Sequence, residues 1–255
     1  MGKSILAAQI SWYLARQGSR EPFENHVNEN HKVFYIDFEL NAAQFRTRYT
    51  GRIADALHFG KNFVRAEFNP SGEDPAMYDK YAKYVQRKID KPISTTKANE
   101  VIIDNIACMG TATSNVGGAL PLMKNLKALK TKYKMSMLIL ADTPKRNQLK
   151  SITVDDLQGS KMIINFADST FAIGQSQLNP GLRYLKQIKQ RNTGSYYRVT
   201  HVVLFNVTKQ KNFLAFQSMG YNNEQSHLQR SGVAITGEVK KRIIEINRQG
   251  LAPDR

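Results

Sequence analysis

The chain has 255 residues, 41% of them hydrophobic, so it is long enough to bury the core of one large domain. No apolar run approaches the ~18 residues of a membrane-spanning helix, and the N-terminus lacks the pattern of a secretory signal. The single cysteine, Cys108, excludes an internal disulfide framework and offers no metal-binding spacing. We therefore expect a globular, cytoplasmic protein that does not enter a membrane.

The charge balance indicates a polyanionic partner. The sequence contains 37 Lys and Arg against 21 Asp and Glu, which leaves a net charge of +16 at pH 7. Nucleic acid fits this charge better than a membrane surface does, because no strongly amphipathic, lipid-facing helix is evident. The alternative is a solvated basic surface that only aids solubility.

The first residues carry the most informative motif. Gly2-Lys3-Ser4 precedes an apolar-periodic stretch that predicts a helix over 2–17, ended by Gly18 and Pro22. Gly-Lys-Ser at the start of a helix is the second half of the phosphate-binding pattern G-x-x-x-x-G-K-[ST], in which the lysine meets the β- and γ-phosphates and the hydroxyl holds Mg²⁺. Gly2, Lys3 and Ser4 are therefore the candidate nucleotide-binding residues, with Ser4 also a metal ligand. Met1 takes the fifth position of the pattern, so its first four positions and the strand before them are not in this sequence.

Two apolar stretches end in carboxylates. Residues 33–40 predict a buried parallel strand that ends with Asp37 and Glu39, and residues 101–106 predict a second one that contains Asp104. Asp104 has the setting of a Walker B carboxylate, which holds Mg²⁺ through water at the end of an apolar strand. Asp37 and Glu39 compete for the role of general base, and Glu39 is favoured because it lies just past the strand end.

The rest of the chain alternates helices with strands and then changes to hairpins. Helices are predicted at 42–57, 76–88, 119–133 and 157–166, with polar breaks at 91–99 and 110–118. Strands are predicted at 63–68, 136–141, 168–173, 183–189, 198–207 and 213–218. This order predicts an α/β fold with a mostly parallel sheet, flanked by helices and extended by antiparallel C-terminal strands. One domain at 1–230 and a basic tail at 231–255 are expected.

Four separated motifs agree in order and spacing with one family. Gly2-Lys3-Ser4, residues 35–39, 101–104 and 140–146 together resemble the motifs of RecA-like P-loop ATPases of the hexameric replicative helicase class. The resemblance is strongest to the plasmid RepA group and its AAA-type relatives on bacterial mobile elements. It implies a RecA-like core that is truncated within Walker A and lacks its first strand. Asp142 departs from the family pattern, which normally has His or Gln before Thr-Pro-Lys at this sensor position.

The resemblance also implies catalytic roles and an assembly. Glu39 is similar to the glutamate that polarises the attacking water, and Asp104 to the Walker B carboxylate. Lys189 and Arg191 resemble a Lys-x-Arg pair that such hexamers insert into the nucleotide site of the neighbouring subunit, where an arginine can be worth roughly 10³-fold in rate. The implied cofactors are ATP and Mg²⁺. The implied assembly is a homo-oligomer, up to a hexameric ring around single-stranded DNA.

Two further segments are candidates for contact with DNA. Lys145, Arg146 and Lys150 lie in a loop where related proteins contact DNA phosphates, although a solvated loop would have the same composition. The loop has no aromatic residues suited to base stacking. Residues 238–255 resemble the first helix and turn of a resolvase-type helix-turn-helix, and the alternative is an ordinary basic terminal helix.

Two functions remain open at this point. The first is an ATP-dependent, helicase-like DNA motor in the replication or mobilisation of a plasmid or transposon. The second is a DNA-binding accessory or regulatory protein that keeps the fold without hydrolysing ATP. The completeness of the phosphate-binding loop distinguishes them, because half of the usual phosphate cradle is absent from this sequence.

Overall fold

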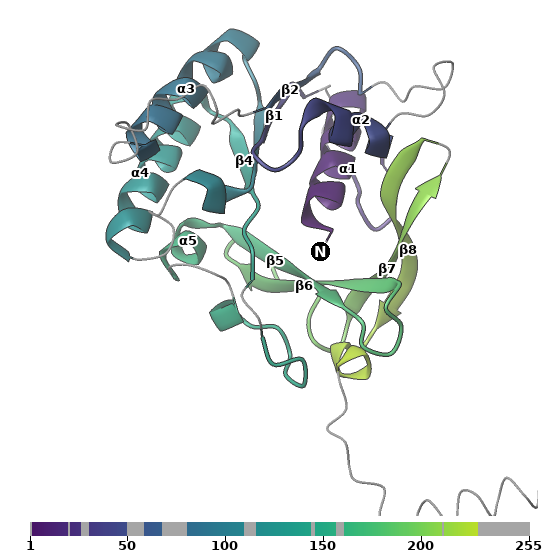
Figure 1. The fold of residues 1–255 in the computed structure, drawn as a ribbon. Coiled ribbons are helices and arrows are strands. Elements are labelled where there is room, and N and C mark those ends of the chain that lie inside the picture. Colours follow the sequence, from purple (N-terminus) through teal and green to yellow (C-terminus); the bar gives the residue numbers. More distant parts are fainter. Residues whose placement is uncertain are drawn as a thin grey trace, which may run out of the picture.

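A computed structural model of the protein describes residues 2–19, 21–26, 31–49, 59–67, 81–109, 116–143, 146–156, 161–210 and 212–228. Two four-stranded sheets organise it (Figure 1). The first sheet has the order β2-β1-β3-β4, with every neighbouring pair parallel. Its strands are β1 (Val33–Asp37), β2 (Phe63–Glu67), β3 (Glu100–Asp104) and β4 (Ser136–Ile139).

The second sheet is antiparallel and has the order β5-β6-β7-β8. Its strands are β5 (Ser169–Gln175), β6 (Leu182–Gln190), β7 (Val202–Gln210) and β8 (Phe213–Asn222). The predicted α/β class is confirmed. The expected single extended sheet is not seen, because no pairing joins β4 to β5 within the described residues.

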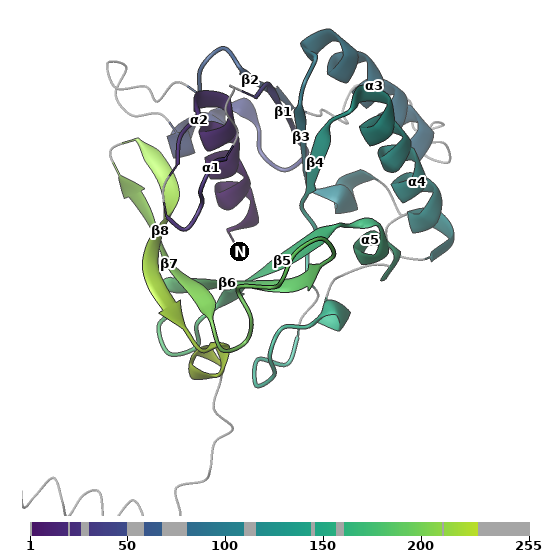
Figure 2. The ribbon, with the colours of Figure 1, turned by 180° about the vertical axis from the view of Figure 1, so that it is seen from behind.

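Within the described residues, five α-helices accompany the sheets. They are α1 (Lys3–Arg16), α2 (Ala42–Tyr49), α3 (Tyr81–Thr96), α4 (Val116–Tyr133) and α5 (Lys161–Phe166). Figures 1 and 2 show α3 and α4 together on one side of the parallel sheet, and α1 between that sheet and the antiparallel one. The two helices α3 and α4 share a core with the strand residues Phe34, Ile36, Val101 and Ile103.

Helix α1 packs on both sheets. Its alanines at 7, 8 and 15 join Tyr35 and Ile102 on the other face of the parallel sheet, while Leu6 packs on the antiparallel sheet. The buried side chain of Gln9 fixes the second contact. Its amide accepts a hydrogen bond from the N–H of Phe216 at 2.8 Å and donates one to the carbonyl of Phe216 at 3.1 Å. Helix α1 is therefore held in place by apolar burial on one side and by a paired backbone contact on the other.

Some predicted boundaries were wrong for identifiable reasons. The break predicted at 91–99 is helical as far as Thr96, although Pro92 lies inside α3. Ile89 and Ile93 are 3% and 1% exposed, and the burial of Ile93 offsets the hydrogen bond that Pro92 cannot make. Helix α4 begins at Val116, within the loop predicted at 110–118. The tail at 231–255, and its predicted helix-turn-helix, lie outside the described residues.

Candidate nucleotide-binding site

The predicted nucleotide-binding segment at the start of α1 lies at the carboxyl edge of the parallel sheet, together with the predicted acidic ends of β1 and β3. Asp37 and Asp104 end neighbouring strands and are direct register partners. The N-terminus of α1 reaches the same edge, because Lys3 contacts Asp142 just beyond β4. The first turn of α1 contains no acidic residue, and Gly2 before it makes no side-chain cap. The helix therefore presents backbone N–H groups and a positive dipole end to this edge, which favours an anion.

Gly2 is required by the geometry of the turn into α1. Its φ of 111° lies in the left-handed region, and a Cβ atom at this position would lie 2.8 Å from Cζ of Phe216. Any side chain would therefore be strained and would also collide with the antiparallel sheet. The close approach of Gly2 to Phe216 keeps the start of α1 against the sheet edge.

A chain of polar side chains connects Lys3 to Glu39. Lys3 Nζ lies 2.5 Å from Asp142 Oδ1. Asn105 donates through its Nδ2 to Asp142 Oδ2 at 2.5 Å and to Glu39 Oε1 at 3.0 Å. Burial alone would raise the pKa of the Asp142 carboxyl, but the hydrogen bonds from Lys3 and Asn105 outweigh burial and lower it. Asp142 is therefore an ionised partner of the candidate phosphate-binding lysine at neutral pH.

Asp104 is fully buried at the centre of this edge. One carboxylate oxygen, Oδ2, accepts a hydrogen bond from the hydroxyl of Tyr35 at 2.6 Å. Burial raises the pKa of Asp104 to about 6, the hydroxyls of Tyr35 and Ser4 oppose the rise, and the charge of Glu39 adds to it. Oδ1 is buried and has no hydrogen-bond partner in the part of the chain that the structure describes. A buried, unpartnered carboxylate oxygen beside the Ser4 hydroxyl fits the oxygen ligands that Mg²⁺ prefers, directly or through water.

The two competing acids have different surroundings. Asp37 is 0% exposed, and its Oδ1 accepts the backbone N–H groups of Glu39 and Leu40 at 3.0 and 2.8 Å. Its Oδ2 accepts from Nε of Arg65 at 3.0 Å, so Asp37 builds the turn that ends β1. Glu39 is exposed and faces the polar chain through Asn105. The geometry leaves Glu39 as the acid available for chemistry, and its role as base stays a prediction.

Lys189 and Arg191 lie away from this edge. Lys189 Nζ donates to the carbonyl of Ile164, and Arg191 forms an ion pair with Asp168 at 3.7 Å. Asp168 also pairs at 3.0 Å with Lys130, near the end of α4, which leads directly into the start of β4. The pair therefore lies at the amino end of the parallel strands, opposite Lys3. Burial, together with the charge of Arg191, lowers the pKa of Lys189.

The loop predicted to contact DNA is partly anchored. Lys145 lies outside the described residues. Arg146 lies 3.5 Å from Asp156 and donates to the carbonyl of Lys150, whereas the Lys150 side chain is exposed. The loop ends at Ile152, whose backbone N–H donates to Glu224 and whose carbonyl accepts from Lys186. Lys186 and Glu224 form a buried ion pair, 2.6 Å apart. The DNA-binding role of these three basic residues stays a prediction.

An aromatic strip on the antiparallel sheet was not predicted from the sequence. We use this name for Tyr197, His201 and Tyr221. The rings of His201 and Tyr221 stack at 4.4 Å with an interplanar angle of 9°, and those of Tyr197 and Tyr221 lie 6.3 Å apart at 13°. Tyr221 is 50% exposed. No local pattern signals this strip, because its members come from two segments that meet only in the folded sheet.

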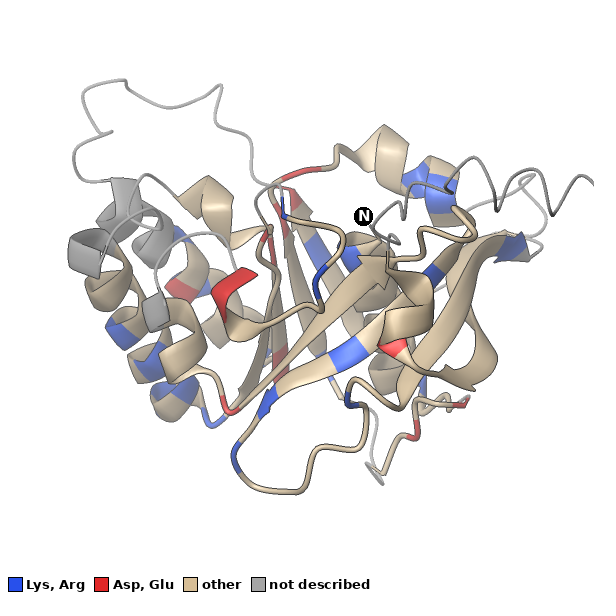
Figure 3. Cartoon of the chain, turned by 90° about the horizontal axis from the view of Figure 1, so that it is seen from below, with Lys and Arg blue, Asp and Glu red and all other residues tan. Residues whose placement is uncertain are grey.

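The basic residues of the described chain are dispersed. Figure 3 shows the Lys and Arg residues spread over the helices and the antiparallel sheet rather than gathered on one element. Across the described ranges, no group of three or more His, Cys, Asp or Glu side chains is placed to hold a metal ion. No described helix is long and apolar enough to cross a membrane.

The arrangement of the elements defines an α/β fold of the RecA-like class. A solved structure with a similar fold is that of the KaiC-like protein PH0186 from the hyperthermophilic archaeon Pyrococcus horikoshii OT3. The two align with a TM-score of 0.54 over 85% of this chain and 84% of that one, at 16% sequence identity. The similarity therefore concerns the fold. No protein-family model matches the chain, and no curated protein sequence does.

Proposed function

We propose that this chain is an ATP-binding protein of the RecA-like ATPase class, with its nucleotide site at the N-terminus of α1. The observation that carries the proposal is the polar chain from Lys3 through Asp142 and Asn105 to Glu39. It lies beside the buried Asp104, which has an unpartnered oxygen. A lysine, a helix N-terminus and two carboxylates of different burial are the components that phosphoryl transfer to water requires.

Each residue has a distinct role in this proposal. Lys3 and the first N–H groups of α1 bind the phosphates, and Ser4 with Asp104 holds Mg²⁺, which would neutralise phosphate charge. Glu39 orients and deprotonates the attacking water, and Asn105 fixes the position of the Glu39 carboxylate. Arg191 lies at the opposite end of β4 from Lys3, which supports a role in the site of another subunit rather than in that of its own chain. The catalytic use of Lys189 and Arg191 therefore requires a homo-oligomer, such as a ring.

We further propose that the nucleic acid partner is single-stranded DNA and that the protein acts in the replication or mobilisation of a plasmid or transposon. The net charge of +16 supports a polyanionic partner. The aromatic strip adds ring surfaces on which bases can stack. One observation favours the alternative function, a DNA-binding accessory protein without hydrolysis. Asp142 forms an ion pair with Lys3, whereas the ATPases that the sequence resembles normally have His or Gln at this position.

Steady-state ATP hydrolysis, measured with and without single-stranded DNA, tests these proposals. We expect hydrolysis in the full chain to depend on Lys3 and to be lost in Glu39→Gln, with ATP binding retained in Glu39→Gln. Mixing Glu39→Gln with Arg191→Ala subunits should restore part of the activity if Arg191 acts in trans. Absence of ATP binding in the full chain, with DNA binding intact, would favour the accessory function. Absence of both would refute the proposed function.

A further inference from the structure

Among the four described strands of the parallel sheet, Arg65 on β2 is the one basic residue. Its side chain is only 12% exposed, and it lies next to Asp37, whose side chain is fully buried. An arginine is seldom buried unless its charge is paired, because burial removes the water that solvates the guanidinium. The partners of Arg65 therefore indicate the role of this residue.

Arg65 fixes the turn between β1 and α2 at two points. Its Nε and Nη2 atoms both lie against Asp37 Oδ2, at 3.0 and 2.9 Å. Nη2 also donates to the carbonyl of Leu40. Asp37 in turn accepts the N–H groups of Glu39 and Leu40 through its other oxygen, Oδ1. The backbone of Leu40 is therefore held at its N–H and at its carbonyl, and that of Glu39 at its N–H.

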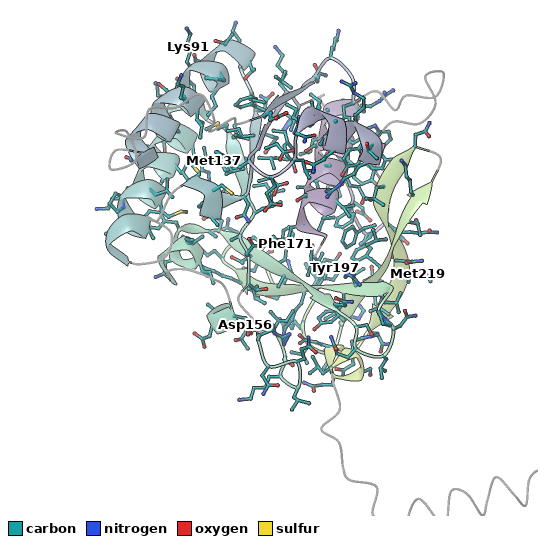
Figure 4. The ribbon with its side chains drawn as sticks, viewed as in Figure 1. Lys91, Met137, Asp156, Phe171, Tyr197 and Met219 are labelled. Carbon is teal, nitrogen blue, oxygen red and sulfur yellow. The ribbon has the colours of Figure 1, made fainter. Side chains whose placement is uncertain are left out.

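A second set of contacts joins Arg65 to α2. The guanidinium lies 4.7 Å from the ring of Phe45 on α2, which is a cation–π contact. Glu67, two residues further along β2, lies 3.8 Å from Arg65 and accepts the N–H of Ala42, the first residue of α2, at 2.7 Å. Figure 4 shows the side chains of β1, β2 and α2 crowded together at this place. Both ends of the turn at 38–41 are therefore attached to β2.

These contacts distinguish the two acids that follow β1. Both oxygens of Asp37 are occupied, Oδ1 by backbone N–H groups and Oδ2 by the guanidinium. Glu39 is exposed, and its Oε1 accepts from Asn105, which also donates to the Asp142 partner of Lys3. Arg65 therefore engages Asp37 in the turn and leaves the Glu39 carboxylate at the edge where Lys3 lies.

We propose that Arg65 is the positioning residue for Glu39. It holds the turn in the arrangement that directs the Glu39 carboxylate towards Asn105, and it neutralises the charge of Asp37. The role of Glu39 as base belongs to the proposed function, on which this inference rests. A general base must lie within about 2.6–3.2 Å of the group whose proton it takes, and a displacement of ~1 Å can slow a reaction by ~10²-fold. Loosening the turn should therefore slow hydrolysis without weakening ATP binding.

The substitution Arg65→Lys in the full chain tests this role. Lysine keeps a positive charge next to Asp37, but its single ammonium group lacks the planar fork that contacts Asp37, Leu40 and the Phe45 ring together. We expect kcat for ATP hydrolysis to fall by roughly 10–100-fold, with the KM for ATP within ~2-fold of wild type. Arg183→Lys is the matched control and should leave kcat unchanged, because Arg183 also donates to two carbonyls but lies on the antiparallel sheet.

A second substitution shows whether Arg65 acts through Glu39. In a Glu39→Gln background the base is already lost, so Arg65→Lys should lower the residual rate by less than ~2-fold. A residue with only a structural role would lower the rate by the same factor in both backgrounds.

Amide hydrogen exchange reports on the turn without any nucleotide. The N–H groups of Glu39 and Leu40 should exchange at least ~10-fold faster in Arg65→Lys than in wild type, because their acceptor Asp37 is less firmly held. The N–H of Ile103 in β3 should exchange at the wild-type rate.

The double substitution Asp37→Asn with Arg65→Met separates positioning from stability. It removes both buried charges, so no unpaired carboxylate is left, and it still removes the donor to the Leu40 carbonyl. Its Tm should be close to that of wild type, whereas kcat should remain at least ~10-fold lower. Recovery of kcat together with the Tm would show that Arg65 contributes stability alone.

The outcomes distinguish this inference from the proposed function. If wild type hydrolyses ATP and Glu39→Gln does not, the proposed function stands, and a normal kcat in Arg65→Lys overturns the inference. It is also overturned by a parallel loss of kcat and ATP affinity, by an equal loss in the Glu39→Gln background, or by unchanged exchange at Glu39 and Leu40. If wild type binds ATP without hydrolysing it, the proposed catalytic function fails and the positioning role fails with it, even where exchange at the turn responds to Arg65→Lys.

Discussion

The substitution Asp142→Asn tests the resting state of the candidate site most directly. The ion pair between Lys3 and Asp142 joins atoms 2.5 Å apart, with side chains 30% and 42% exposed. If Lys3 binds phosphate, this pair must weaken, so the carboxylate competes with the nucleotide. Asparagine has nearly the same shape and can still accept the hydrogen bond from Asn105.

The expected size of the effect follows from the exposure of the pair. Exposed ion pairs contribute ~0.2–1 kcal/mol, and hydrogen bonds to charged groups contribute ~1.5–3 kcal/mol. Because both side chains are partly exposed, we expect ~1–2 kcal/mol, which is a gain of roughly 5–30-fold in ATP affinity. Removal of a negative charge close to the phosphates acts in the same direction.

A titration with a fluorescent ATP analogue, at fixed Mg²⁺ and ionic strength, measures this change. Asp90→Asn is the matched control, because Asp90 pairs with Lys132 on the helical surface and its loss removes the same charge. Unchanged or weaker binding in Asp142→Asn, with normal thermal unfolding, would refute the assignment of Lys3 as a phosphate ligand restrained by Asp142.

Three further predictions follow from buried or stacked groups. Burial raises the Asp104 pKa from 3.8 to about 6, so the folded state loses stability as pH rises through this window and the carboxyl ionises. In denaturant unfolding at pH 8 without Mg²⁺, Asp104→Asn should therefore be more stable than wild type by ~1–3 kcal/mol. Below about pH 4, where both side chains are neutral, this difference in stability should vanish. Gln9→Leu should lower the free energy of unfolding by ~2–4 kcal/mol in urea titrations, because it leaves two buried backbone groups of Phe216 unpaired, whereas the exposed Gln177→Leu should have little effect. Tyr221→Ala should weaken single-stranded DNA binding by ~1–3 kcal/mol in anisotropy titrations, and an equal loss in Met219→Ala on the same strand would contradict a stacking role.

Local sequence patterns were sufficient to predict the helix and strand that carry the individual residues of the site. The glycine, lysine and serine before an apolar-periodic stretch predicted the start of α1, and the apolar run at 101–106 predicted β3, which ends two residues earlier, at Asp104. The contacts between these components were not predictable. Asn105 bridges Glu39 and Asp142, which lie 66 and 37 residues away in the chain, and only the strand register brings them together.

The errors came from tertiary contacts that override local preference. The polar composition of 91–99 predicted a break, but α3 continues to Thr96 because the burial of Ile93 outweighs the hydrogen bond that is lost at Pro92. The sequence could not predict that the two sheets are separate, because the apolar pattern of β4 is the same whether one or both of its edges are paired. Similarly, Gln9 looks like an exposed helix residue until Phe216 on β8, 207 residues away, supplies two backbone partners in addition to the Tyr13 hydroxyl on α1 itself.

The electrostatics of the site link its cation and its nucleotide. The charge of Asp37 is balanced by Arg65, and that of Asp142 by Lys3. Glu39 and Asp104 form no ion pair with any Lys or Arg in the described part of the chain, and the proximity of these two carboxylates is one reason why the Asp104 pKa is raised. Free ATP would bring further negative charge to this excess, whereas a divalent cation would neutralise it. The same two carboxylates therefore disfavour the free nucleotide and favour its Mg²⁺ complex, since the cation relieves the repulsion that each of them feels.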